Sequence, residues 1–486
     1  MRKIWYSRMV FSGIAFLYYF LPVVLLLYFV VPFQYRNRVL LLASLLFYAW
    51  GEPVYVLLML FVIASGYGAG LWIEKCIDKS RPLQKKRITS KRVLAGSVIL
   101  FTGVLLFFKY TDFFIGNWNR ITGASCPLLR LALPIGISFY IFQVLSYLAD
   151  VYRGEVRAQK NIVSFALYVS MFPQLIAGPI VRYQAVSAEI RERRTTWEDA
   201  EYGISRFIIG LSKKVLIANE LGELCEIFRA SGEKSVLYYW IYAVAFSLHI
   251  YFDFSGYSDM AIGLGRIFGF SFPENFRYPY VSKSITEFWR RWHMSLGTWF
   301  RDYVYIPLGG SRVSAWKRYR NIFLVWMLTG LWHGASWNFV IWGLYFGILL
   351  IVEKRWLLKS LENMKWLNHV YVLFLVTLSF VIFHASDLYQ ATEDICCLFG
   401  LGGLPVATTE AIYYLKSYGL TLLIACVGST PFVAGIRNRI KQKRAECEKQ
   451  SFAESVWKPI GLAGLMLLCT AYLADGSFNP FLYFRF

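Results

Sequence analysis

The sequence comprises 486 residues, of which 57% are hydrophobic and 19% aromatic, with a formal net charge of +21. Such a composition is too apolar for an ordinary soluble protein, and repeated apolar runs of spanning length predict a polytopic helical membrane protein. The basic residues cluster in short loops between these runs, so we attribute the charge to membrane topology and anionic lipid rather than to nucleic acid. The eight cysteines show no metal-ligand spacing, and we therefore expect no metal site.

Four apolar runs occupy the first part of the chain. The run 11–31 is expected to span, and 39–72 is interrupted at Gly51-Glu52-Pro53. Whether 39–72 crosses once or twice stays open, and with it the orientation of the N-terminus. Residues 74–92 carry eight Lys or Arg, which predicts a cytoplasmic loop, and the run 93–110 then leads outward.

Two segments broken by Pro and Gly follow, at 133–140 and 172–179. Such breaks at membrane depth free backbone groups that only neighbouring helices or water can satisfy, so we expect these segments to line a cavity. The charged stretch 182–203 predicts a surface helix, and 210–214 predicts a short amphipathic segment near the lipid headgroups.

The next predicted span, 235–252, leads directly into Asp253 and Asp259. Ser255 and Asp259 share a helical face at i,i+4 spacing, whereas Asp253 and Asp259 do not, so the two acids form no evident carboxylate pair. Acids next to apolar sequence are costly. We favour buried acids bonded to backbone or tyrosine, and we keep both as candidate residues of a substrate tunnel.

A capping box, Ser284 to Glu287, predicts a helix that runs from Phe288 to Phe300. Basic residues and His293 alternate with tryptophans along it. An amphipathic aromatic-basic helix of this length is expected at the membrane interface rather than across the bilayer.

The apolar run 321–351 has Lys and Arg on both flanks, so both of its ends are predicted to be cytoplasmic. A helix from Asn321 would rise roughly 18 Å before the break at 334–336, against a hydrocarbon core of roughly 30 Å. His333 is therefore predicted near the top of a hairpin. An ionisable side chain at that depth is expensive and predicts a functional site.

Charged loops alternate regularly beyond residue 354. The loop 385–415 has no Lys or Arg and is predicted outside, 437–458 is basic and inside, and the run 459–473 exits again. The C-terminal tail, 479–486, is thus expected on the extracytoplasmic side.

His333 and His293 are the candidate catalytic residues among five histidines. A neutral imidazole can act as a general base on a hydroxyl near neutral pH. Candidate substrate or tunnel residues surround His333 in the sequence: Trp332, Ser336, Trp337 and Asn338. The chain contains no Walker A or GxSxG pattern, which argues against phosphoryl transfer and serine-hydrolase chemistry.

Several strings follow one another across most of the chain. They are LPIGISFYIFQVLSYLADVYRG from Leu133, FPQLIAGPIVRY from Phe172, YFDFSGYSDMAIGLG from Tyr251, PENFRYPY from Pro273, FWRRWHMSLGTWFRDYVYIPLGG from Phe288, LWHGASWNFVIWG from Leu331 and NPFLYFRF at the end. Together they resemble the membrane-bound O-acyltransferase family, and most closely its bacterial branch that acetylates exopolysaccharides such as alginate. The D-alanyl-transfer proteins of teichoic acid modification resemble the sequence as a related branch of the same family.

The resemblance implies that His333 is the catalytic histidine and His293 the second candidate. It also implies a single all-α domain over 1–486 in the bacterial plasma membrane. In that fold a ring of about 11 transmembrane helices, with re-entrant and interfacial helices, surrounds a central tunnel. The acyl donor approaches from the cytoplasm, and the acceptor is modified outside.

The expected reaction is transfer of an acyl group, most simply acetyl, from a cytoplasmic thioester to a polysaccharide hydroxyl, with acetyl-CoA as donor and no bound cofactor. His333 would deprotonate the hydroxyl or carry the acyl group covalently, and the sequence leaves both open. Asn338, tryptophan indoles and His293 are candidate oxyanion donors. Four basic residues are candidates for the donor phosphates, although a plain topology signal is the favoured interpretation of all four: Arg312, Lys317, Arg318 and Arg320.

The resemblance further implies a separate extracytoplasmic partner of the SGNH-hydrolase type, docked at 385–413 or at the C-terminal tail. Three alternatives stay open. These are D-alanyl transfer from a carrier protein, a transporter that uses His333 as a proton relay, and a scaffold without catalysis of its own.

Overall fold

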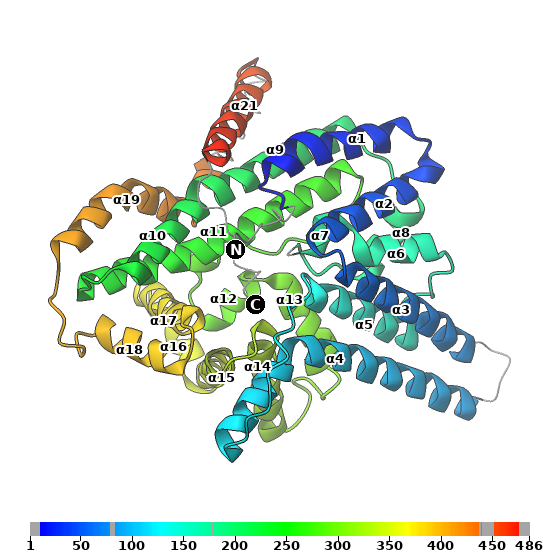
Figure 1. Ribbon diagram of the computed structural model, residues 1–486, viewed down its shortest axis with the longest axis horizontal. Helices are drawn as coiled ribbons and strands as arrows, with labels where there is room; N and C mark the ends of the chain where they lie inside the picture. The colour runs from blue at the N-terminus through cyan, green and yellow to red at the C-terminus, as the bar shows by residue number, and fades with distance from the viewer. Residues whose placement is uncertain (1–9, 78–82, 177, 437–438, 440–451, 476–486) are drawn as a thin grey trace. The chain divides into compact units, whose positions relative to one another are not determined.

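The computed structural model describes residues 10–77, 83–176, 178–436, 439 and 452–475. All regular secondary structure in these ranges is helical, as predicted (Figure 1). Six helices are long and apolar enough to cross a membrane: Tyr55–Ile77, Ile88–Thr122, Trp337–Asn363, Leu367–His384, Thr409–Gly428 and Val456–Ala474. The chain is thus an all-α multi-pass membrane protein, while the predicted count of about 11 spans stays a prediction.

The described chain groups into two compact units, Met1–Ile204 with Ala261–Pro273, and Ser205–Met260 with Glu274–Phe486. This grouping does not test the prediction that residues 1–486 form a single domain. The predicted C-terminal tail, 479–486, and most of the basic loop 437–458 lie outside the described residues.

Helices of the first unit follow the predicted order with different lengths. They are the π-helical η1 (Phe16–Phe20), α1 (Leu21–Val30), α2 (Phe33–Gly51), α3 (Tyr55–Ile77), α4 (Leu83–Thr122), α5 (Ile137–Arg153), α6 (Ile162–Ser170), α7 (Phe172–Leu175), α8 (Tyr183–Arg191), the first half of α9 (Trp197–Ser212) and the end of α11 (Val236–Ile267) from Ala261. The break at Gly51-Glu52-Pro53 is confirmed. The first apolar run forms only the shorter helix Phe16–Val30, whereas α4 extends over 40 residues and exceeds the predicted 93–110.

The two broken segments of this unit meet in space. Gly136 precedes α5 with a φ of 70°, and a Cβ at this position would overlap the Leu175 carbonyl at the end of α7. Only glycine permits both the left-handed backbone and this approach. The predicted single surface helix over 182–203 is wrong, because the chain is extended between α8 and α9.

Helices of the second unit carry the predicted site. They are the end of α9, the π-helical η2 (Lys213–Ala218), α10 (Asn219–Ala230), α11 (Val236–Ile267) up to Met260, the short η3 (Pro279–Val281), α12 (Ile285–Arg291), α13 (Met294–Phe300), the π-helical η4 (Arg301–Tyr305), α14 (Ala315–His333), α15 (Trp337–Val352), the π-helical η5 (Glu353–Leu357), α16 (Leu358–Asn363), α17 (Leu367–His384), α18 (Leu388–Leu398), α19 (Thr409–Gly428) and α21 (Phe452–Ala474). The last helix starts before the predicted residue 459 and contains Pro459.

The hairpin predicted around His333 is confirmed as α14 and α15, which end and begin on either side of 334–336. Glycines allow these two helices to pack closely. A Cβ on Gly343 would overlap the Trp326 carbonyl, and one on Gly330 would overlap the Phe339 carbonyl. The helix backbones therefore touch at this crossing, and the end of α14 is fixed relative to α15.

We predict that Gly343→Ala lowers the thermal stability of the purified protein. The added methyl must push α14 away from α15, and such overpacking costs about 1–3 kcal/mol. Gly419→Ala on α19 is the matched control, because nothing lies within 4 Å of a Cβ there. Melting curves in the same detergent compare the two, and an unchanged melting temperature for Gly343→Ala would contradict the close crossing.

Candidate active site

His333 is the last residue of α14 and is only 8% exposed. Three aromatic rings surround its imidazole, with centroids 4.9 Å away for Trp332 and for Trp342 and 5.2 Å away for Phe383, all in edge-to-face geometry. These rings come from α14, α15 and α17, so the histidine is held where three helices meet. An aromatic cage of this kind keeps bulk water away from the ring.

The structure brings the two candidate histidines to one indole. The Trp332 ring lies 4.9 Å from the His333 ring and 5.9 Å from the His293 ring. Trp332 is itself 5% exposed. Both candidate catalytic histidines therefore contact the ring of Trp332, a residue also among the predicted candidates.

His293 lies at a break that the sequence analysis did not predict. The expected continuous helix from Phe288 to Phe300 is wrong: α12 ends at Arg291, and α13 begins at Met294. The break is bonded to a neighbouring loop, because the Met294 amide donates to the Asn275 carbonyl over 3.0 Å. His293 has a φ of 44°, a strained left-handed conformation that a side chain rarely adopts outside functional sites.

Asn275 determines the proton position on His293. Its side-chain oxygen accepts from the Ser295 amide (3.2 Å) and the Ser295 hydroxyl (2.9 Å), and a backbone N–H can only donate, so this atom is the oxygen. The same oxygen lies 3.2 Å from His293 Nδ1, which must then carry a proton and donate. Nε2 of the neutral ring therefore keeps its lone pair. Burial lowers the pKa of His293 to about 3, so the ring stays neutral at physiological pH.

A cavity of about 570 Å³ adjoins this histidine. Its wall includes His293, the indoles of Trp289 and Trp326, and Thr329, which stands one helical turn before His333. The volume falls in the range of about 300–1,000 Å³ that is typical of small-molecule sites. Neither His333 nor Trp332 is part of this wall; His293 is the wall residue whose ring contacts Trp332.

Three basic side chains also line the cavity: Arg290, Arg301 and Lys354. The sequence analysis missed them as ligand contacts. Arg301 pairs with Asp302 over 2.6 Å. Among the residues predicted for donor phosphates, the half-buried Arg318 lies within electrostatic range of Lys354, whereas Arg312, Lys317 and Arg320 are exposed. None of those four predicted residues lines this cavity, and their role in binding donor phosphates stays a prediction.

The amide of Asn338 ties helices together instead of facing the cavity. Its nitrogen donates to the Ala385 carbonyl (2.8 Å) and to the Ile382 carbonyl (3.4 Å) at the end of α17. With both hydrogens turned to these carbonyls, Asn338 is unsuited to the predicted role of oxyanion donor. Ser336 is partly buried before α15, and Trp337 is 48% exposed.

The two acids of α11 are ion-paired, which argues against a tunnel role. Asp253 pairs with Lys214 over 2.6 Å, and both side chains are 2% exposed. Asp259 pairs with Arg206 (2.8 Å) and with Lys213 (2.7 Å). The expectation that backbone or tyrosine groups would satisfy them is wrong, because cations on α9 and η2 do so. Paired buried acids of this kind are structural.

Comparison with known proteins agrees with this architecture. The sequence profile of the membrane-bound O-acyltransferase family matches residues 80–388, and the chain belongs to this family. It is therefore a membrane O-acyltransferase.

Particular relatives refine the placement. A probable alginate O-acetylase of Azotobacter vinelandii is 38% identical over 98% of this chain and all of its own length. A peptidoglycan O-acetyltransferase of Helicobacter pylori is 34% identical over 84% of this chain and 83% of its own. A teichoic acid D-alanyltransferase of Bacillus subtilis is 31% identical over 53% of this chain and 69% of its own.

We predict that Asn275→Leu lowers the turnover number by about tenfold, which corresponds to about 1.4 kcal/mol, the size of one lost hydrogen bond. Without its acceptor, the His293 ring loses both its orientation and its proton position. Asn368→Leu is the matched control, since Asn368 is equally buried but donates to the Leu361 carbonyl away from the cavity. Turnover per folded molecule is measured for both, and equal losses would contradict a specific role for Asn275.

Proposed function

We propose that this O-acyltransferase moves an acetyl group from acetyl-CoA, bound from the cytoplasm, to a hydroxyl of a polysaccharide outside the bacterial plasma membrane. The observation that carries the proposal is the cavity, whose wall includes three basic side chains and the neutral His293; the His293 ring contacts Trp332, whose ring in turn contacts His333. A site of this kind combines anion recognition with a base in dry surroundings.

The relatives favour acetyl over D-alanyl as the transferred group. The relatives named for acetylation align with 84% to 98% of this chain, whereas the D-alanyltransferase of Bacillus subtilis aligns with 53%. Their named polymers, alginate and peptidoglycan, both offer sugar hydroxyls. We therefore place the acceptor among hydroxyl-bearing cell-surface polysaccharides.

In the proposed reaction an imidazole nitrogen of His333 takes the proton of the acceptor hydroxyl as its oxygen attacks the thioester carbonyl. The carbon–sulfur bond then breaks, and the proton passes from the imidazolium to the leaving thiolate. His293, whose Nδ1–H donates to Asn275 and whose Nε2 keeps a lone pair, accepts a hydrogen bond from the acceptor hydroxyl beside the cavity. Two successive transfers through an acyl-histidine would give the same products.

The basic side chains of the cavity wall would recognise the donor. Arg290 and Lys354 offer positive charge to the phosphates, while Trp289 and Trp326 offer apolar surface to the arm that carries the thioester. Arg318, near Lys354, adds to the same positive field.

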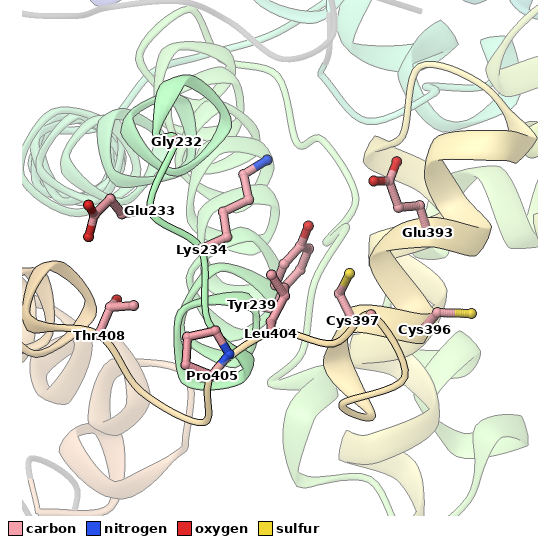
Figure 2. A pocket seen from close by; sticks show the side chains of 11 residues that line it. Gly232, Glu233, Lys234, Tyr239, Glu393, Cys396, Cys397, Leu404, Pro405 and Thr408 are labelled. Carbon is pink, nitrogen blue, oxygen red and sulfur yellow. The ribbon is translucent and has the colours of Figure 1, made fainter.

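An extracytoplasmic partner of the SGNH-hydrolase type completes the proposal. A groove of about 520 Å³ lies in the second unit between residues 232–239 and 393–408, a region that includes the predicted outer loop. Figure 2 shows the Lys234 ammonium, the Tyr239 hydroxyl and the Glu393 carboxylate turned toward the same side of this groove. Tyr239 belongs to a residue type that is enriched at protein interfaces, and we therefore propose this groove as the docking site of the partner.

We predict that His333→Ala abolishes transfer of labelled acetyl from acetyl-CoA by protein in lipid vesicles, because the hydroxyl loses its base or its acyl carrier. His249→Ala is the control: His249 bonds the Ala218 carbonyl and should leave turnover per folded molecule unchanged. Mass spectrometry of surface polysaccharide from cells that carry each variant gives the second readout. If cells with His333→Ala acetylate their polysaccharide normally, the protein is a scaffold without catalysis of its own. If the variant still moves substrate across the membrane and the wild-type protein transfers no acetyl, the protein is a transporter.

We further predict that Arg290→Gln raises the KM for acetyl-CoA about tenfold with little change in kcat. Rising salt concentration should also raise the KM of the wild-type enzyme for acetyl-CoA, because salt screens the same charge interaction. Arg312→Gln is the matched control, since Arg312 is exposed and does not line the cavity. An equal effect of both variants would mean that a diffuse surface charge, rather than the cavity, attracts the donor.

A further inference from the structure

Glu353 is a completely buried acid that the proposed chemistry does not use. Its side chain is 0% exposed, and it lies where α15 passes into the π-helical turn η5. A buried carboxylate is costly unless several donors satisfy it. Packing alone therefore does not account for a buried carboxylate at this position of the second unit.

The donors come from the beginning of α12, far away in the sequence. The Glu353 carboxylate accepts from the Ile285 amide (2.6 Å), the Thr286 amide (2.8 Å) and the Thr286 hydroxyl (2.7 Å). Local capping reaches only the following amide, that of Glu287, which donates to the Ser284 hydroxyl over 3.0 Å. A residue 68 positions away thus satisfies backbone groups that the capping box leaves over.

The segment held in this way carries the cavity wall. Thr286, Trp289 and Arg290 of α12 line the cavity, and His293 follows at the strained break after it. On the other side of the contact, Lys354 lines the same cavity directly after Glu353. The π-helical turn shifts the helix register at this point, a feature frequent at functional sites. Two neighbouring residues of η5, Glu353 and Lys354, thereby contact α12 and the cavity, respectively.

We propose that Glu353 is a positioning residue: its carboxylate holds α12 so that His293 and Arg290 keep their places on the wall of the cavity. The α12 segment has only seven residues and cannot hold its own direction by helix propensity. Three hydrogen bonds to a charged group are strong and directional. This inference rests on the proposed function for its kinetic readout, but its structural readout is independent of any activity.

The test compares Glu353→Gln with Glu362→Gln, an exposed acid on α16 that serves as control. The amide of glutamine has one acceptor oxygen, and its NH₂ group would face the donors of Ile285 and Thr286. We expect hydrogen exchange at the Ile285 and Thr286 amides to accelerate at least about tenfold in Glu353→Gln, and kcat to fall about tenfold or more. Glu362→Gln should change neither quantity.

A double variant separates positioning from general destabilisation. Because Glu353 and Asn275 both act on the placement of His293, Glu353→Gln combined with Asn275→Leu should lose little more kcat than the worse single variant. The proposal would be overturned if the fall in kcat of the double variant equalled the product of the two single falls. It would also be overturned if hydrogen exchange at the Ile285 and Thr286 amides were unchanged in Glu353→Gln. If Glu353→Gln does not fold, Thr286→Val, which removes one of the three bonds, should show the same changes at smaller size, and no acceleration of exchange would overturn it.

A wild-type enzyme that transfers no acetyl would refute the proposed function alone. The exchange comparison would then still decide whether Glu353 holds α12.

Discussion

The contact on which the site depends is the indole of Trp332, packed edge to face between the imidazoles of His293 and His333. The two histidines come from different elements, a strained turn after α12 and the end of α14. The Trp332 ring contacts both and so couples their positions. The close crossing of α14 and α15 at Gly330 and Gly343 is a precondition, because a wider crossing would draw Trp342 away from His333.

The parts of this arrangement that depend on local chemistry were predictable from the sequence. The hairpin around His333 follows from basic flanks, helix length and the small residues 334–336, and the structure places its turn there. The capping box is confirmed, since Ser284 accepts from the Glu287 amide, although α12 begins at Ile285, directly after its cap, and not at the predicted Phe288. These signals involve residues that are neighbours in the chain, so pattern and structure coincide.

The parts that depend on distant partners were not predictable. Nothing within 288–300 marks the break at His293, because an amide of the break is bonded by Asn275, whose side chain also meets the His293 ring 18 positions away in the chain. The acid Asp253 is costly by itself, but its cation, Lys214, lies on another helix. For Glu353 the partners are 68 positions away. The hydrophobic periodicity of a sequence indicates which face of a helix is buried. It does not indicate which distant polar group pairs with a polar side chain on that face.

The distribution of charge in the second unit fits the anionic donor of the proposed function. Acids deep in the second unit, Asp253 and Glu353, are fully engaged by a cation or by backbone donors, so they add no open negative charge. The cavity wall contains three basic side chains and no acid. A low-dielectric wall strengthens that positive field for a ligand that enters it. In the proposed function the neutral His293 would border the uncharged thioester end of the donor rather than its phosphates, next to the Trp332 indole that also contacts His333.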